Sequence, residues 1–507
     1  MSKKDLHFRS SYLPPLMVYM AAGISGLTAI VSTFYVKESL GLSAEFIAVI
    51  AFWNSLIWAA KMPLGHMVDL FWRYKTIFVF LGAGLIASNL LIMLGLLTQD
   101  SQLLAILSTE HWFIIATLTA TLGYTLQDVV ADAMTVEAVP VTNSLGQPYN
   151  EQQLKIMHTT MQSLGRFAII GGSVFVAALN IWQFSGIENM NLADKNQAYI
   201  SIYLSALFIP LTSISGVLLH QYLKPQGHID FANTKTEINY YLLLGSLAFV
   251  VFTVIMGTSD FTFSQELVFL GSLTIIIYLI YKISLTLDPK TRLTLFSTAA
   301  VIFVFRAMPS PGAGASWFQI DQLGFDQQFY AILSLLASMV TLLGIAVYRR
   351  YFSDLSIAYI IVALTVLQTL MTLPNIALYY GVHEWTAAMT NGLVDAKFIA
   401  IMDTALESPL GQIAMIPMLA WIAQSAPIAL KATFFAVMAS CMNLALSAGQ
   451  LLTQYLNKIF LINREVIDAN TQVLVTAANY EQLGYLLITV MIIGLILPIS
   501  SNFFRST

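Results

Sequence analysis

Three carboxylates stand inside one strongly apolar stretch of the chain. The segment from Leu126 to Glu137 reads LQDVVADAMTVE and carries Asp128, Asp132 and Glu137. Ionised side chains are costly inside a bilayer, so those that occur there usually mark substrate pathways or proton relays. Asp128 and Asp132 are four residues apart and therefore share one face of a helix. We expect the functional site on this face.

A polar stripe extends along the same predicted helix. Successive helical residues turn by about 100°. The stripe therefore consists of Thr121, Thr125, Asp128, Asp132 and Thr135. Glu137 points nearly the opposite way, close to the end of the helix. Lipid cannot solvate such a stripe, so it must face protein or water. The two aspartates either hold helices together through neighbouring basic groups, or contact a substrate, relay protons, or do both.

The following helix offers a basic partner for these carboxylates. One face of it carries Lys155, Thr159, Gln162 and Arg166 at helical spacing. Arg166 is predicted near the depth of Asp128. Two carboxylates facing one guanidinium leave one acid whose ionisation depends on what else binds. Such an acid can take up a proton during transport.

A second basic residue, Arg306, is predicted near mid-bilayer. The run AMPSPGAGA follows it, and two prolines and two glycines there should break the helix. Broken backbone at membrane depth is tolerated where it lines a cavity. Trp317, Gln319 and Asp321 follow at the predicted outer mouth. An arginine at this depth favours an anionic ligand, and the alternative is a kink that serves packing.

Asp403 and Glu407 repeat the four-residue spacing near the outer end of a later apolar helix. Their position is compatible with two interpretations. They are either solvated residues of the mouth or a further pair with a role in transport.

The composition identifies the class of protein. Of 507 residues, 57% are hydrophobic and 10% are charged, and the mean hydropathy is +0.75. Soluble domains average about a quarter charged residues, so we expect a polytopic membrane protein. A net charge of −4 spread along the chain gives no basic patch for nucleic acid. The single cysteine, Cys441, excludes an intrachain disulfide.

Other functional classes lack their signatures. The chain has no His-Glu-x-x-His motif, no Cys/His cluster and no serine elbow, so an enzyme is disfavoured and no cofactor or metal is expected. A sensor usually carries a soluble output domain. The longest loops, around 223–238 and 457–482, are too short for one.

Fourteen apolar stretches are long enough to span a bilayer. They cover about 14–36, 43–62, 76–97, 112–138, 153–180, 198–222, 239–257, 266–286, 293–311, 327–348, 355–379, 398–426, 430–456 and 483–504. With both termini cytoplasmic, 15 Lys and Arg residues lie in inner loops and 5 in outer ones. This bias predicts that both termini lie in the cytoplasm. We expect the membrane to be a bacterial inner membrane.

An internal repeat predicts two related halves. Residues 34–48 read FYVKESLGLSAEFIA, and residues 317–331 read WFQIDQLGFDQQFYA. The identical pairs are Leu40/Leu323, Gly41/Gly324, Phe46/Phe329 and Ala48/Ala331. We therefore expect an all-α membrane protein of 14 transmembrane helices in a 6+2+6 order. The bundles would be 1–222 and 293–507, with linkers and a two-helix insert at 223–292. This plan resembles the major facilitator superfamily.

The segment after the second span supports this resemblance. It reads KMPLGHMVD from Lys61 to Asp69 and leads to Arg73, similar to the superfamily's Gly-xxx-Asp…Arg signature. Gly65 permits a tight turn in this loop, and Asp69 can cap a helix or pair with a basic residue across the bundle. We expect these residues, together with Asp321, to take part in gating. The alternative is an ordinary basic cytoplasmic loop.

The chain as a whole resembles the folate–biopterin transporter family. The matching passages are KMPLGHMVD from Lys61, DVVADAMTVE from Asp128, RAMPSPGAGASWFQIDQLGF from Arg306 and GQIAMIPM from Gly411. The resemblance implies uptake of folates or pterins together with protons. It also implies that the transport residues are Asp128, Asp132, Lys61, Arg166 and Arg306.

These residues suit such a substrate chemically. A carboxylate can bind the 2-amino-4-oxo edge of a pterin with two hydrogen bonds, as it binds guanidinium. We predict a monomeric, proton-coupled secondary transporter for a folate, a pterin or a similar organic anion, working by alternating access. The predicted substrate contacts are Asp128, Asp132, Gln162, Arg166, Arg306, Trp317 and Gln319. Alternatives are a muropeptide or nucleotide-like substrate, or a sensor that does not transport.

Overall fold

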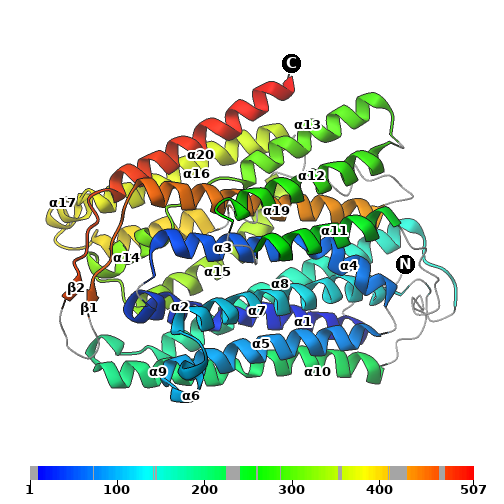
Figure 1. The fold of residues 1–507 in the computed structure, drawn as a ribbon. Helices are drawn as coiled ribbons and strands as arrows, with labels where there is room; N and C mark the ends of the chain where they lie inside the picture. The colour runs from blue at the N-terminus through cyan, green and yellow to red at the C-terminus, as the bar shows by residue number, and fades with distance from the viewer. Residues whose placement is uncertain are drawn as a thin grey trace. The chain divides into compact units, whose positions relative to one another are not determined.

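The computed structural model describes residues 9–40, 42–71, 74–140, 142, 146–223, 240–257, 261–285, 287–351, 357–408, 410, 431–467 and 474–506. Most of them are helical (Figure 1). Ten helices in this part of the chain are long and apolar enough to cross a membrane. They confirm a polytopic helical membrane protein, and the full set of fourteen spans stays a prediction.

The chain divides into two compact units. The first comprises Met1–Ser32 and Pro63–Leu243, and the second comprises Thr33–Met62 and Leu244–Thr507. The repeat predicted two bundles, 1–222 and 293–507, with an insert at 223–292. That division stays a prediction.

The elements up to residue 257 agree closely with the predicted spans. They are η2 (Ser10–Tyr12), α1 (Leu13–Ile24), η3 (Ser25–Thr28), α2 (Ala29–Tyr35), η4 (Val36–Leu40), α3 (Ala44–Ala59), α4 (Lys61–Leu70), α5 (Lys75–Leu97), α6 (Ser101–Ile106), α7 (Thr109–Glu137), α8 (Glu151–Gln183), η6 (Ile187–Asn189), α9 (Leu192–Ala206), α10 (Phe208–Leu223) and α11 (Tyr240–Gly257). The sixth predicted span consists of two helices, α9 and α10, that meet at Leu207.

The remaining elements belong to the second unit. They are α12 (Ser264–Ser284), α13 (Pro289–Arg306), α14 (Ala313–Asp321), α15 (Gln327–Tyr351), α16 (Ile357–Tyr379), α17 (Val382–Met389), a helix over 396–408, α19 (Lys431–Ile459), β1 (Val466–Ile467), β2 (Leu474–Thr476) and α20 (Leu483–Ser506). The two strands form a short antiparallel hairpin, pairing Val466 with Thr476 and Ile467 with Leu474. The break predicted after Arg306 is confirmed, because residues 307–312 are not helical.

In the first unit, glycines let helix backbones approach closely. A Cβ added at Gly82 on α5 would lie 2.8 Å from the carbonyl oxygen of Gly123 on α7. A Cβ at Gly23 on α1 would lie 2.0 Å from the carbonyl oxygen of Ile169 on α8. Small residues are the usual means of tight packing between helices in lipid, where hydrophobic burial contributes little to association.

A buried amide also fixes α7 to its neighbours. Gln127 is 3% exposed. Its Nε2 donates to the Val79 carbonyl on α5 at 3.1 Å and to Ser213 Oγ on α10 at 2.9 Å. Both amide hydrogens therefore have acceptors, which a polar group in an apolar interior requires. These bonds set the rotation of α7 and hence the direction of its acidic face.

In the second unit, α3 lies along α19. Ser440 Oγ accepts from the Met62 backbone N–H at 3.1 Å, and Asn443 Nδ2 donates to the Trp58 carbonyl at 3.0 Å. Near the other end, Lys458 pairs with Glu45 at 3.2 Å. The helix α3 is therefore attached to α19 near both of its ends.

The two copies of the repeat have the same local geometry where their second helix begins. Ser43 Oγ accepts from the Phe46 backbone N–H at 3.1 Å, and Asp326 Oδ1 accepts from the Phe329 backbone N–H at 2.7 Å. Both side chains satisfy an otherwise unpaired N–H in the first turn of a helix. The matched residues Phe46 and Phe329 thus occupy the same position in α3 and α15.

The expectation of a loop with a tight turn at Gly65 was wrong. Residues 61–70 form the helix α4, and Gly65 lies inside it. A Cβ added at Gly65 would lie 3.9 Å from Val129 Cγ1 on α7, the nearest atom to it. The segment KMPLGHMVDL places Pro63 in the first turn, where proline is compatible with a helix. The glycine therefore does not end the helix.

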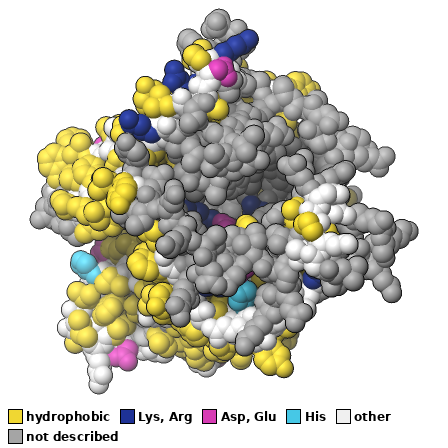
Figure 2. Space-filling view, turned by 90° about the vertical axis from the view of Figure 1, so that its right-hand side faces the viewer, with side chains coloured by type: hydrophobic (Ala, Val, Ile, Leu, Met, Phe, Trp, Pro, Cys, Tyr) yellow, Lys and Arg dark blue, Asp and Glu magenta, His cyan; other side chains and the backbone are white. Residues whose placement is uncertain are grey.

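The outer surface is apolar over wide areas. Figure 2 shows patches of hydrophobic side chains, in yellow, on the described surface at one end of the molecule. Large apolar side chains that are at least half exposed occur on several long helices, among them Leu81, Leu91, Phe167, Phe175 and Phe208. Exposed apolar surface of this extent suits a lipid environment.

Two glycines on α5 provide a matched test of the packing between α5 and α7. Gly82→Ala places its methyl group against backbone, whereas Gly84→Ala meets nothing within 4 Å. We expect Gly82→Ala to lower the free energy of unfolding by about 1–3 kcal/mol. Gly84→Ala should leave it unchanged or raise it slightly, because alanine favours helix. Thermal unfolding of both purified variants in detergent tests this, and equal melting temperatures would contradict it.

Candidate functional site

The acidic face of α7 meets a tyrosine from α1. The Tyr19 hydroxyl donates to Asp132 Oδ1 at 2.5 Å. The tyrosine is 5% exposed, whereas Asp132 is exposed. A buried phenol needs an acceptor, and here the carboxylate supplies it. The bond holds Asp132 in place while leaving part of the carboxylate accessible.

Asp128 and Arg166 lie close to the same tyrosine. The charges of Asp128, Asp132 and Arg166 all act on the Tyr19 hydroxyl, so the three predicted residues are gathered around it. Within the described part of the chain, no ion pair of 4.0 Å or less joins Arg166 to either carboxylate. Both Asp128 and Arg166 are partly buried. The arrangement is thus a cluster of charges around one phenol, and we call it the Tyr19 cluster.

A glycine makes room for the tyrosine ring. A Cβ added at Gly165, next to Arg166 on α8, would lie 2.8 Å from Tyr19 Cε2. The ring therefore lies directly against α8 while its hydroxyl reaches α7. Any larger residue at position 165 would displace the ring from the carboxylate.

The threonines of the predicted stripe bond to their own helix. Thr121, Thr125 and Thr135 donate to the carbonyls of Thr117, Thr121 and Asp132 at 3.0, 2.8 and 2.6 Å. Thr125 and Thr135 are 0% and 1% exposed. Their hydroxyls thus satisfy themselves on the α7 backbone, a common behaviour of threonine within helices. On this face Asp132 is exposed, and Thr121 and Asp128 are partly exposed.

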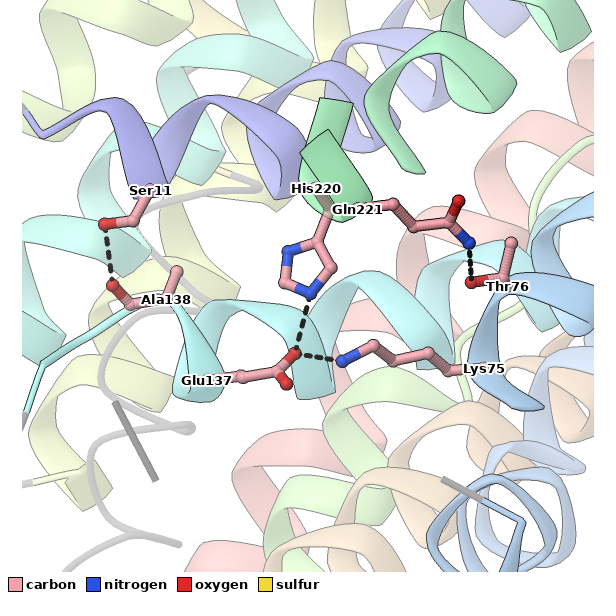
Figure 3. Close-up of polar contacts among 7 residues, drawn as sticks. All are labelled: Ser11, Lys75, Thr76, Glu137, Ala138, His220 and Gln221. Carbon is pink, nitrogen blue, oxygen red and sulfur yellow. Dashed lines mark hydrogen bonds and ion pairs between the residues drawn. The ribbon is translucent and has the colours of Figure 1, made fainter. Parts of the chain in front are cut away.

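Glu137 lies apart from the Tyr19 cluster, as its helical phase predicted. It forms an ion pair with Lys75 at the start of α5, and His220 Nε2 on α10 lies 3.4 Å from its Oε2 (Figure 3). All three side chains are largely buried. In the same view, Ser11 Oγ donates to the Ala138 carbonyl at 3.0 Å. Glu137 thus joins three helices of the first unit at one end of α7.

Several predicted residues lie outside the described part of the chain. Arg73 is one of them. The backbones of α4 and α8 are described, but the side chains of Asp69, Lys155, Thr159 and Gln162 are not. Lys61 is described, and its Nζ lies 5.4 Å from the centre of the Trp58 ring.

Arg306 is the last residue of α13, immediately before the break. It is partly buried, and its Nε donates to the Met442 carbonyl on α19 at 3.2 Å. Among the described residues it has no acidic partner within 4.0 Å. The guanidinium carries five N–H donors, so this bond leaves donors and charge available to an anion.

The broken segment is held against α19. The Ser310 backbone N–H donates to Thr453 Oγ1 at 2.9 Å, and Asn457 Nδ2 donates to the Pro311 carbonyl at 3.3 Å. Gly312 has φ +76° and ψ −165°, a conformation that is essentially restricted to glycine. These contacts replace the helical hydrogen bonds that the break removes.

Gln319 belongs to a chain of hydrogen bonds that crosses the second unit. Tyr330 Oη donates to Gln319 Oε1 at 2.9 Å, and Gln319 Nε2 donates to Asn375 Oδ1 at 3.2 Å. Asn375 Nδ2 in turn donates to Asp403 Oδ2 at 2.8 Å. The structure thus connects the predicted substrate contact Gln319 to the acidic residue Asp403, whose role the sequence left open.

Asp321 is the centre of a charged cluster at the end of α14. It forms an ion pair with Lys37 from η4 and accepts from the Tyr480 hydroxyl at 2.5 Å. Its charge also acts on the buried Arg464. Burial lowers the pKa of the Arg464 guanidinium and the carboxylate of Asp321 raises it, so the two charges support each other. We call these four residues the Asp321 cluster.

Trp317 lies beneath this cluster. It is 2% exposed, and the Arg464 guanidinium lies 5.6 Å from the centre of its ring. The ring packs in a core with Leu456, Ile462 and Tyr480. In this structure Trp317 therefore supports the charged cluster through a cation–π contact.

The sequence analysis missed Tyr19, Lys37, Arg464 and Tyr480 as partners of the predicted acids. One signal was present for Tyr19, because a tyrosine inside a membrane span needs a hydrogen-bond acceptor. The other three come from segments far from Asp321 in the sequence, and no local spacing connects them to it.

Comparisons with known proteins agree with this architecture. The sequence profile of the BT1 family matches residues 22–504. A folate-biopterin transporter from Synechocystis sp. is 22% identical over 448 residues, which cover 87% of this chain and 74% of that protein.

Solved transporter structures are also similar. A POT family transporter in complex with 5-aminolevulinic acid has a TM-score of 0.64 at 14% identity, covering 98% of this chain and 96% of that one. A mutant of the nucleoside transporter NupG has a TM-score of 0.56 at 13% identity, covering 98% and 100%. The fold and the family together identify a membrane transporter rather than an enzyme. The chain belongs to the BT1 family.

Proposed function

We propose that this protein is a proton-coupled secondary transporter for a folate, a pterin or a similar organic anion, working by alternating access. The observation that carries the proposal is the Tyr19 cluster, where Asp128, Asp132 and Arg166 are gathered around one buried phenol. Charged groups at membrane depth are expensive unless they serve a pathway. The similarity to a folate-biopterin transporter supports the substrate class.

Asp132 is the residue we propose to carry the proton. Its Oδ1 accepts from Tyr19, which holds the carboxylate in one orientation. Asp128 and Arg166, which carry opposite charges, lie near the same tyrosine. A substrate that pairs with Arg166 would weaken the support for the negative carboxylate and favour protonation. Binding of an anion and of a proton would then favour each other.

Arg306 is the residue we propose to bind the anionic part of the substrate. Its Nε bond to the Met442 carbonyl leaves further donors in the fixed fork of the guanidinium, which suits a carboxylate. The broken segment next to it is held by α19, so the arginine sits at a defined place. An arginine without an acidic partner among the described residues can accept other organic anions as well. A muropeptide or a nucleotide-like molecule is therefore the second candidate.

The Asp321 cluster is the proposed gate at the outer end. The repeat predicts Lys37 in the first six-helix half and Asp321 in the second, so rocking of those predicted halves would separate their ion pair. In the structure both residues belong to the second compact unit. Lys61, Gly65, Asp69 and Arg73 would act at the cytoplasmic end. The charge bias of the loops supports cytoplasmic termini.

The coupling proposal predicts the behaviour of Asp132→Asn. In proteoliposomes, uptake of labelled folate or biopterin should increase under an inward proton gradient. Asp132→Asn should reduce this uptake by about tenfold or more, because the amide cannot exchange a proton. The matched control is Asp194→Asn, which changes an exposed aspartate of the same unit. Uptake that is indifferent to the gradient, or unchanged in Asp132→Asn, would refute the coupling.

The anion-binding role predicts a difference between substrates for Arg306→Gln. We expect the KM for folate, which carries a glutamate tail, to rise about tenfold, equivalent to about 1.4 kcal/mol. The KM for uncharged biopterin should change much less. Arg292→Gln on the same helix is the control, because Arg292 lies over the Tyr281 ring at 5.9 Å, at the other end of α13. Equal changes for both substrates would argue against a contact with the anion.

The gating role predicts that tying Lys37 to Asp321 stops transport. The double variant Lys37→Cys/Asp321→Cys is made in a Cys441→Ser background, since Cys441 is the single native cysteine. A short bifunctional thiol reagent cleavable by reductant should abolish uptake in this variant, and reductant should restore it. Each single cysteine variant treated alike controls for modification. Full uptake by the cross-linked protein would exclude opening at this contact.

A further inference from the structure

The second unit contains a buried carboxylate that the proposed mechanism does not use. Asp403, on the helix over 396–408, is 8% exposed. Three successive hydrogen bonds lead to it, from Tyr330 to Gln319, from Gln319 to Asn375 and from Asn375 to Asp403 Oδ2. Hydrogen bonds arranged in one direction polarise one another, so this series strengthens its last bond, the one to Asp403 Oδ2.

The other oxygen of this carboxylate has no partner. Asp403 Oδ1 is buried and makes no hydrogen bond within the described residues. No Lys, Arg or His of the described residues forms an ion pair with Asp403 within 4.0 Å. The neighbouring charge on its own helix is Glu407, which is also negative. Among the described residues, this buried carboxylate oxygen thus has neither a donor nor a counter-charge.

The other charged and titratable groups nearby do not compensate Asp403. Lys397, on the same helix, has its Nζ 5.5 Å from the centre of the Phe329 ring on α15. Tyr330, also on α15, reaches Asp403 only through the two amides. The partner from α16 is the neutral Asn375. No element packed against Asp403 in the described structure therefore presents a positive group to it.

This environment favours the neutral acid. An ionised carboxylate with one hydrogen bond and a negative neighbour loses far more solvation on burial than it recovers. Protonation of Oδ1 removes the charge and leaves Oδ2 free to accept from Asn375. The neutral form therefore needs no counter-ion in this conformation.

We propose that Asp403 binds and releases a proton during the transport cycle, as a carboxyl site separate from Asp128 and Asp132. The step is a proton transfer alone. An Oδ1–H bond forms when hydronium gives up a proton to the carboxylate, and it breaks when water takes the proton away. The two bridging amides, Gln319 and Asn375, line a small cavity with room for about one water molecule.

The position of Gln319 connects the protonation state of Asp403 to the rest of the unit. Gln319 lies on α14, which follows the broken segment after Arg306. Release of the proton would draw the Asn375 amide toward the new charge and change the bond to Gln319. The state of Asp403 is in this way connected to α14. A role in transport rests on the proposed function, whereas the titration of Asp403 does not.

Infrared difference spectroscopy tests the titration without any substrate. Spectra of the purified protein at acidic minus alkaline pH should contain a band of a protonated carboxylic acid that disappears in Asp403→Asn. The band should remain in Glu407→Gln and in Asp395→Asn, which changes an exposed aspartate at the start of the same helix. If Asp403→Asn does not fold, Asp403→Glu should shift the band. A spectrum without such a band, or one unchanged in both Asp403 variants, would overturn the proposal.

Transport assays test the link to the cycle. Asparagine mimics a permanently neutral acid, so steps that require proton release should fail in Asp403→Asn. We expect gradient-driven net uptake to fall about tenfold, while exchange of substrate between equal pools stays within about twofold of the wild type. Normal gradient-driven uptake would remove Asp403 from the cycle. Failure of the wild type to transport pterins or folates would refute the proposed function and leave the infrared result standing.

Discussion

The arrangement of this protein depends on the cost of placing charge where water is scarce. Three acidic side chains of the helical units have partners that reduce this cost in different ways. Asp132 accepts from a buried phenol, Glu137 pairs with Lys75 and His220, and Asp321 pairs with Lys37. Removing one partner from a buried pair is strongly unfavourable. These charge pairs therefore hold particular helices together, and separating any of them costs free energy.

The break between α13 and α14 shows how such a unit accommodates irregular backbone. Residues 307–312 lose their helical hydrogen bonds, and α19 replaces some of them through Thr453 and Asn457. A Cβ added at Gly449 would lie 2.7 Å from the Met308 carbonyl oxygen, so α19 is as close to the break as a residue without a side chain permits. The broken segment is thus supported along its length, and Arg306 is held at its beginning.

The sequence predicted the features that depend on local pattern. Apolar runs predicted the long helices, and the prolines and glycines after Arg306 predicted the break. The helical phase predicted that Glu137 lies apart from Asp132. It did not predict Tyr19 or Lys37 as partners, because those contacts join segments more than 100 residues apart. The turn at Gly65 was wrong because α4 begins at Lys61 with Pro63 in its first turn, and a helix tolerates a single interior glycine at a cost of about 1 kcal/mol. The series of hydrogen bonds from Gln319 to Asp403 could not be predicted, because it joins three helices that only the tertiary structure brings together.

The close approach of α1 and α8 has a thermodynamic consequence for ligand binding. With the Gly23 Cα surface against the Ile169 carbonyl, and Gly165 against the Tyr19 ring, these helices cannot slide past one another without a clash. The Tyr19 ring is therefore held in place against α8. A ligand at the site proposed here would lose little free energy to the ordering of this ring, so its affinity would depend mainly on the match of charge and shape.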